Sequence, residues 1–298
     1  MSAPTASTPG WRVALLTALA MLAFAANSLL TRMALQGDRI DPASFGSVRL
    51  VSGALVLAAI VQWRQGPHAA PRREWLAAAM LAAYVVCFSY AYVTLAAGTG
   101  ALILFGAVQL TMFTAGLAHG ERFAPLAWSG FALALAGLVY LVSPGLAAPA
   151  PLGTALMAAA GVAWGVYSLR GRGAGDPVAT TAGNFARATP LALAVSAASL
   201  ALAGSPRADA AGLGLAIASG ALTSGLGYVI WYAALPGLSS LRAATVQLAV
   251  PPLAALGGVL WLAEPLTSRL VLSSLAILGG IALVLFGRTV AAQRRRSR

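Results

Sequence analysis

Lysine is absent from this chain, and charged residues of either sign are few. Charged residues occupy 9% of the 298 positions, whereas soluble globular domains carry about 25%. So few charges cannot cover a surface that faces water, and much of this surface must therefore face lipid. The missing lysines also exclude a glycine-rich phosphate loop that ends in Lys. A primary pump built from this chain alone is thereby excluded.

Cysteine and acidic residues are also scarce. Cys87 is the single cysteine, so a disulfide framework is excluded, and we expect neither a metal site nor a cofactor. All seven acids fall between apolar runs or at their ends: Asp38, Asp41, Glu74, Glu121, Asp176, Asp209 and Glu264. This placement argues against a proton relay through a buried carboxylate. It leaves open coupling through an acid at a loop edge, such as Glu121.

Apolar residues are what the chain has in abundance, with 59% of positions hydrophobic and a mean hydropathy of +0.83. A membrane-crossing helix needs about 20 predominantly apolar residues. Strands of a membrane barrel would alternate over about 10 residues, and these runs are apolar throughout. We therefore predict an all-α integral membrane protein with ten transmembrane helices, at residues 11–34, 44–63, 75–96, 98–117, 124–142, 151–169, 181–203, 212–235, 242–262 and 266–286.

The nineteen arginines predict how this bundle is oriented. With ten spans both termini lie on one side, which then holds fourteen arginines, and the other side holds Arg32, Arg39, Arg49, Arg207 and Arg269. Because positively charged loops stay in the cytoplasm, we predict a multi-pass protein of the bacterial inner membrane with both termini cytoplasmic. No basic patch interleaved with aromatic residues lies on a soluble segment, so we expect no nucleic-acid partner.

The two halves of the chain share a series of short motifs in the same order. An odd number of helices in each half would make the second copy enter the membrane from the opposite side. We therefore predict two inverted five-helix repeats, residues 1–147 and 148–298, the second with a basic tail. The alternative is that Ala- and Gly-rich helices align by chance. The matching motifs are Phe24 with Arg32 and Trp164 with Arg172, Asp41-Pro42 with Arg49 and Asp176-Pro177 with Arg187, and Glu121 with Gly137 and Glu264 with Gly280.

These motifs give the chain its resemblance to a known family. Its Trp164-Gly165 pair, the Arg in the second helix of each half and the Glu-then-Gly pattern resemble the EamA type of the drug/metabolite transporter superfamily. The resemblance implies ten helices, a transport function and similarity to aromatic amino acid exporters. One departure is that Pro251-Pro252 interrupts the fourth helix of the second half, whereas the first half has no Pro between Gly98 and Glu121. The two halves are therefore not expected to move identically.

Polar and aromatic side chains at mid-depth identify the candidate binding site. A polar tip at this depth faces a cavity more readily than lipid, although ordinary helix packing would also explain such side chains. The two prolines are expected to leave the carbonyls of Gln247 and Leu248 free. We expect a site between the halves, where the family also has its cavity, lined by helices 1, 3, 4, 6, 8 and 9. The predicted substrate-binding residues are Asn27, Tyr84, Phe88, Gln109, Trp164, Ser224, Tyr228 and Gln247.

Arg49 and Arg187 each lie several residues inside a span. Each could bind a carboxylate or cap a helix end. Reaching toward the nearer interface is the cheaper arrangement, because a long side chain can keep its charge in water. We therefore predict that both arginines extend to the interface.

The sequence predicts a non-enzymatic secondary transporter. It would export a small amphipathic metabolite by alternating access, with an amino acid, including an aromatic one, as the candidate substrate, and work as a monomer or homodimer. A membrane-embedded lipid-modifying enzyme is one alternative, and the lack of intramembrane acids and His counts against it. A channel or scaffold is the other, and saturable, stereoselective flux would separate a transporter from a channel.

Overall fold

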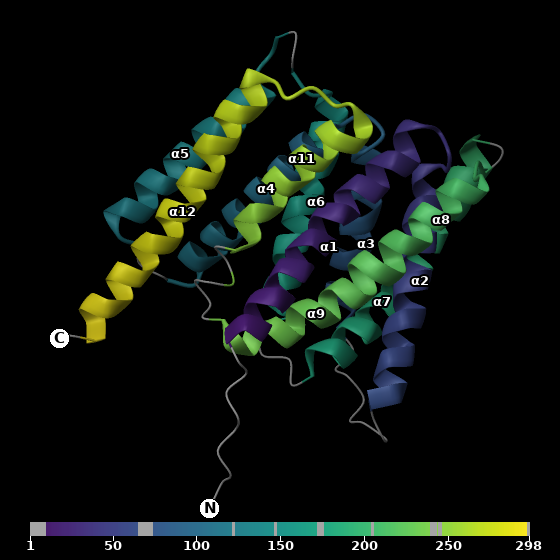
Figure 1. The fold of residues 1–298 in the computed structure, drawn as a ribbon, viewed down its shortest axis with the longest axis horizontal. Coiled ribbons are helices and arrows are strands. Elements are labelled where there is room, and N and C mark those ends of the chain that lie inside the picture. Colours follow the sequence, from purple (N-terminus) through teal and green to yellow (C-terminus); the bar gives the residue numbers. More distant parts are fainter. Residues whose placement is uncertain are drawn as a thin grey trace, which may run out of the picture.

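The protein is a bundle of helices, as Figure 1 shows. A computed structural model describes residues 10–64, 74–120, 123–145, 148–171, 176–203, 206–238, 243 and 246–296, with side chains outside 203 and 287–296. Over these residues the regular structure is helical, apart from an isolated bridge between Ile40 and Ala208. The predicted all-α class is confirmed. Glu121 and Arg172, used in the motif comparison above, lie outside the described residues.

Each predicted apolar run corresponds to a helix or a continuous set of helical segments. Segments α8, η1 and α9 follow one another without a break and form one long crossing with η2. The segments are α1 (Gly10–Gln36), α2 (Pro42–Arg64), α3 (Trp75–Ala91), α4 (Ala97–Ala118), α5 (Pro125–Val142), α6 (Pro151–Arg170), α7 (Pro177–Ala203), α8 (Ala210–Ala218), η1 (Ser219–Leu226), α9 (Gly227–Ala234), η2 (Leu235–Gly237), η3 (Gln247–Ala249), α11 (Val250–Leu262) and α12 (Ser268–Arg296).

Eight helices in the described part of the chain are long and apolar enough to cross a membrane. Two further apolar helices, Trp75–Ala91 and Gln247–Leu262, are shorter. The first of these ends at Ala91 rather than at residue 96, because residues 92–94 form a turn. The chain is thus a multi-pass membrane protein, and crossing by all ten segments stays a prediction. The start of α1 and the end of α12 lie on the same side of the bundle (Figure 1).

Each of the two Asp-Pro motifs caps the start of a helix. Asp41 accepts a hydrogen bond from the Ser44 backbone N–H at 2.9 Å, and α2 begins at Pro42. Asp176 accepts one from the Val178 N–H at 2.9 Å, and α7 begins at Pro177. Proline suits the first position of a helix, where its missing N–H would have no partner, and Asp suits the cap before it. The motif pair therefore starts the second helix of each half.

Contacts between the two halves come in matching pairs. When the helices of each half are numbered one to five, α2 packs on α7, α4 on α11 and α5 on α12, so second meets second, fourth meets fourth and fifth meets fifth. Other contacts come in reciprocal pairs. The third helix of the first half packs on the first helix of the second half (α3 on α6), and the first packs on the third (α1 on α9). In the same way the fourth packs on the first (α4 on α6), and the first packs on the fourth (α1 on α11). This exchange is what a two-fold relation between the halves produces. The opposite direction of the two copies in the membrane stays a prediction.

Small residues bring several helices into close contact. A Cβ atom on Gly161 of α6 would lie 2.6 Å from the Leu104 carbonyl oxygen of α4. A Cβ on Gly280 of α12 would lie 2.5 Å from the Gly130 carbonyl oxygen of α5. Such distances exclude any larger side chain, so the backbones themselves are in contact. The α5–α12 pair stands at one edge of the bundle in Figure 1.

Candidate functional site

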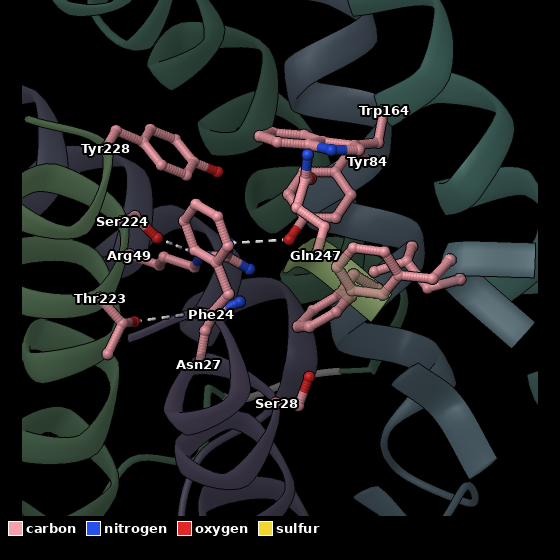
Figure 2. A pocket seen from close by; sticks show the side chains of 13 residues that line it. Phe24, Asn27, Ser28, Arg49, Tyr84, Trp164, Thr223, Ser224, Tyr228 and Gln247 are labelled. Atoms are coloured by element: carbon pink, nitrogen blue, oxygen red, sulfur yellow. Dashed lines mark hydrogen bonds between the residues drawn. The ribbon is translucent and has the colours of Figure 1, made fainter. Parts of the chain in front are cut away.

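A buried cavity lies where helices of both halves meet, and Figure 2 shows the side chains around it. Its free volume is about 30 Å³, which is close to the share of one water molecule in the liquid. The side chains therefore pack almost completely against one another in this conformation. The lining residues are Phe24, Asn27, Ser28, Arg49, Tyr84, Phe88, Leu104, Phe105, Trp164, Thr223, Ser224, Tyr228 and Gln247.

Aromatic rings form one wall of this cavity. The ring centroid of Trp164 lies 4.9 Å from that of Tyr84 and 5.5 Å from that of Tyr228. Phe24 packs edge-on against Tyr228 at 5.9 Å. Separations of 4.5–7 Å in tilted or edge-on geometry are the favoured ones for ring pairs. The three rings at the centre come from α3, α6 and α9, so movement of these helices would open or close the wall.

Hydroxyl and amide groups form a second part of the lining. Asn27, buried in α1, accepts hydrogen bonds at its Oδ1 atom from Ser219 at 2.8 Å and from Thr223 at 3.2 Å. Both hydroxyls belong to η1, a run of π-helix in the middle of the long α8–α9 crossing. A π-helical turn is rare, and it shifts the side chains after it relative to an α-helix. The wider turn presents Thr223 and Ser224 together to the cavity.

Arg49 places a charge in the same cavity, and the prediction that it extends to the interface is wrong. Its side chain is 1% exposed. Its Nε donates to Ser224 and its Nη2 to the Tyr84 hydroxyl, each at 3.1 Å (Figure 2). The guanidinium carbon also lies 5.1 Å from the ring centroid of Phe88. These polar and aromatic partners, which are far apart in sequence, hold the charge inside the bundle.

Close packing of backbones fixes the position of Arg49. Gly220 of η1 lies against the Arg49 carbonyl oxygen and the Ser52 hydroxyl, where no Cβ atom would fit. Gly53, one turn along α2, faces the ring of Phe185, whose Cε1 would lie 2.6 Å from an added Cβ. The two glycines therefore allow η1, α2 and α7 to meet directly behind the guanidinium.

Gln247 lines the cavity, but its backbone carbonyl is not freed by the prolines as predicted, and the free carbonyl of Leu248 stays a prediction. Helix α11 begins at Val250, so Pro251 stands in its first turn instead of interrupting a longer helix. The Val250 N–H donates to the Gln247 carbonyl, which is therefore not free. The Gln247 side chain donates from Nε2 to the Ala243 carbonyl at 3.1 Å. Prolines at a helix start cost no hydrogen bond, and this makes the start the favoured place for them.

The structure brings seven of the eight predicted site residues to one cavity, and Gln109 is the exception. Gln109 is half-buried in α4 outside the cavity, which Leu104 and Phe105 of the same helix line. Sequence reasoning missed these two, and also Phe24, Ser28, Arg49 and Thr223. Phe24 and Ser28 are one turn or less from Asn27, so helical spacing could have included them. Helix α2 was missing from the predicted set altogether.

An ion pair between Arg32 and Glu264 lies one helical turn beyond Ser28 along α1. Arg32 of α1 donates from Nε to Glu264 at 3.2 Å and from Nη1 to the carbonyls of Tyr92 and Val93, each at 2.9 Å. Glu264 also accepts from the Ala97 N–H at the start of α4, at 2.8 Å. The side chains of Arg32 and Glu264 are 13% and 10% exposed. This Arg32–Glu264 cluster joins α1, the α3–α4 turn and the end of α11.

A larger hollow, of about 950 Å³, lies between α1, α8 and α11 near Gln36 and Trp261. It is open and lined mainly by apolar side chains, which suits a surface that faces lipid. Its charged member, Arg39, faces Asp209 at 3.9 Å. The hollow thus has no unpartnered charge, and the buried cavity is the better candidate for a binding site.

Comparison with known proteins gives consistent matches. The model of the EamA-like transporter family matches residues 11–143 and 151–286. The chain is 54% identical over 286 residues to an uncharacterised protein of Pseudomonas aeruginosa, covering 96% of this chain and 99% of that one. It is 31% identical over 252 residues to an uncharacterised transporter of Archaeoglobus fulgidus, covering 80% and 84%. One solved crystal structure superposes with a TM-score of 0.66 at 22% identity, covering 93% and 98%, and at this identity the likeness concerns the fold.

Proposed function

The chain belongs to the EamA-like transporter family and so moves a small solute across a membrane, and from this premise we propose a substrate class, a direction and a mechanism. The substrate is a small amphipathic metabolite of the amino acid class, with aromatic members included. The protein exports it across the bacterial inner membrane by alternating access. The two repeats are residues 1–147 and 148–298.

The observation that carries this proposal is the composition of the buried cavity. Its lining combines aromatic rings with hydroxyl, amide and guanidinium groups, and it draws on both halves of the chain. An amphipathic solute needs two such parts of a lining, one for its apolar body and one for its polar head. Among the residues that line the cavity, none is acidic, so a cationic solute would find no counter-charge there.

The small size of the cavity supports a mechanism with moving helices. About 30 Å³ cannot hold an amino acid, so the rings of Tyr84, Trp164 and Tyr228 must separate before a solute enters. The matched contacts between the halves support an arrangement in which one set of contacts opens as its counterpart closes. Inverted repeats produce two such states, one open to each side of the membrane. The start of α1 and the end of α12 lie on one side of the bundle (Figure 1), which agrees with both termini in the cytoplasm.

A counterflow assay in proteoliposomes tests the proposal. Purified protein would be given each of the twenty amino acids in turn, and saturable exchange of at least one of them is expected. Trp164→Ala should weaken exchange of aromatic substrates more than of small aliphatic ones, because each ring pair contributes roughly 0.5–1.5 kcal/mol beyond area burial.

Trp128→Ala is the matched control for this variant. Trp128 lies in α5 outside the cavity and is 48% exposed. Its replacement should leave the ratio of aromatic to small aliphatic exchange unchanged. Equal loss for all solutes in Trp164→Ala would assign that residue a structural role, and no saturable exchange by the unaltered protein would refute the proposed substrate class.

A further inference from the structure

We propose that Arg49 is the anchor for a carboxylate group, and that the carboxylate, not the ammonium group, is what a solute must carry to bind. This inference rests on the proposed transport function, since it concerns the same cavity. It narrows the solute to a carboxylate with an apolar or aromatic body. A matching amine without the carboxylate would be excluded.

The charge on Arg49 is buried and permanent. A guanidinium keeps its proton throughout the physiological range, so Arg49 cannot escape burial by becoming neutral. Removing an ion from water costs several kcal/mol unless an opposite charge or a full set of hydrogen bonds compensates it. With 1% exposure, Arg49 has almost no contact with water to offset this cost. Such a residue deep in a membrane bundle is a candidate functional group for that reason.

Compensation within the protein is incomplete. The Nε and Nη2 atoms have partners in Ser224 and Tyr84, and both partners are neutral. The Nη1 atom is buried and has no hydrogen-bond partner. Ion pairs in the described part of the chain join Arg32 to Glu264 and Arg39 to Asp209, and neither includes Arg49. A positive charge with free N–H groups therefore stays available in the cavity.

A carboxylate is the ligand group that fits this arrangement. The planar guanidinium fork matches the two oxygens of a carboxylate, and such charge-assisted bonds are among the stronger ones in proteins. An apolar body extending from the carboxylate would meet the rings of Phe24, Trp164 and Tyr228, which line the same cavity (Figure 2). One solute could thus contact both parts of the lining.

An ammonium group has no comparable partner. The cavity lining includes no acidic side chain. Of its two side-chain amides, Asn27 and Gln247, the first already accepts from Ser219 and Thr223 at its Oδ1 atom, and the second is a neutral acceptor. An ammonium group would also stand near the guanidinium charge. The cavity therefore favours the end of an amino acid that carries the carboxylate and offers little to the other end.

Ligand-induced thermal stabilisation of the purified full chain tests this inference without requiring transport. A solute that binds the folded state raises the unfolding temperature according to its concentration and affinity. The probes are carboxylate and amine pairs with the same body: 3-phenylpropionate with 2-phenylethylamine, indole-3-propionate with tryptamine, and 4-methylpentanoate with isopentylamine. We expect stabilisation by at least one carboxylate and by none of the amines.

Substitutions at Arg49 separate charge from geometry. Arg49→Gln should weaken carboxylate binding about 30-fold or more, because it removes one partner of a buried charged pair. Arg49→Lys keeps the charge without the fork, so it should bind carboxylates with intermediate affinity and still reject amines. If Arg49→Gln does not fold, Arg49→Lys decides the question by itself. The matched control is Arg187→Gln, since the Nη1 atom of Arg187 is also buried without a hydrogen-bond partner, whereas this half-buried arginine of α7 does not line the cavity.

The outcomes distinguish this inference from the proposed function. Stabilisation by no carboxylate, equal stabilisation by amines, or unchanged carboxylate affinity in both Arg49 variants would each overturn the carboxylate anchor. Counterflow that accepts amines and survives Arg49→Gln would leave a transporter whose substrate does not use Arg49. Carboxylate binding that depends on Arg49, with no counterflow of any solute, would keep the anchor and overturn the transport proposal.

Discussion

The Arg32–Glu264 cluster should act as a latch on one end of the cavity. Ser28 lines the cavity and is 2% exposed, and Arg32 follows it by one helical turn on α1. Glu264 reaches this position because Ala263 adopts a left-handed conformation, with φ 53°, and turns the chain back after α11. Opening this end requires separation of Glu264 from Arg32 and from the start of α4. We predict that Glu264→Gln favours the open state.

The size of the effect follows from the bonds that change. Hydrogen bonds to a charged group contribute about 1.5–3 kcal/mol and neutral ones about 0.5–1.5 kcal/mol. Glu264→Gln moves the bond from the Ala97 N–H from the first class to the second, and it leaves the Arg32 guanidinium with a neutral acceptor in place of a carboxylate. We take a combined loss of about 2 kcal/mol, and little discount applies because both side chains are at most 13% exposed. At about 1.4 kcal/mol per factor of ten, the open population should rise about 30-fold.

Thiol labelling measures that population. Cys87 is the single cysteine, so Cys87→Ser gives a background in which Ser28→Cys is the only thiol. The labelling rate of this thiol by a charged maleimide, in purified protein, should increase about 30-fold with Glu264→Gln. Asp209→Asn is the control, because the Arg39–Asp209 pair is about half exposed and exposed pairs contribute about 0–1 kcal/mol. Equal labelling rates with and without Glu264→Gln would refute the latch.

Two further predictions concern packing and topology. Gly220→Ala should lower the free energy of unfolding in detergent by about 1–3 kcal/mol, because the new Cβ would overpack against Arg49 and Ser52. Gly214→Ala in the adjoining α8, where an added Cβ meets nothing within 4 Å, should be neutral or slightly stabilising, and equal effects of the two would contradict this view of the α2–η1 contact. An alkaline phosphatase fusion after Arg298 should be inactive in cells if both termini are cytoplasmic. An active fusion would reverse the predicted orientation.

Part of the candidate site could be predicted from the sequence because spacing along a helix is regular. Tyr84 with Phe88, and Ser224 with Tyr228, are one turn apart and so share a helix face. Side chains with polar tips inside apolar runs then indicate a cavity. This reasoning brought seven residues of one cavity together in advance. Gln109 lies on the same helix as Leu104 and Phe105, but beyond the part of α4 that lines the cavity.

The prediction of a free Gln247 carbonyl was wrong for a related reason. Hydropathy shows that residues 242–262 form one apolar run, and it gives no sign of where the helix within that run begins. A proline inside a helix removes a hydrogen bond, while a proline in the first turn removes none. The difference depends on the backbone of the preceding residues, which Val250 and Gln247 show to be a short 3₁₀ turn.

Sequence alone determined that this protein is an α-helical membrane protein, and it predicts two related halves with no carboxylate inside the predicted spans. These properties follow from composition and from the order of residues, since lipid excludes charges and requires helices to satisfy their own backbone. Only the tertiary structure decided that the Arg49 side chain is buried. Its sequence neighbours are compatible with a side chain that extends to water, and its burial depends on Ser224, Tyr84 and Gly220, which lie on other helices. A charge in a span becomes a binding group only when distant segments surround it and leave part of it unpaired.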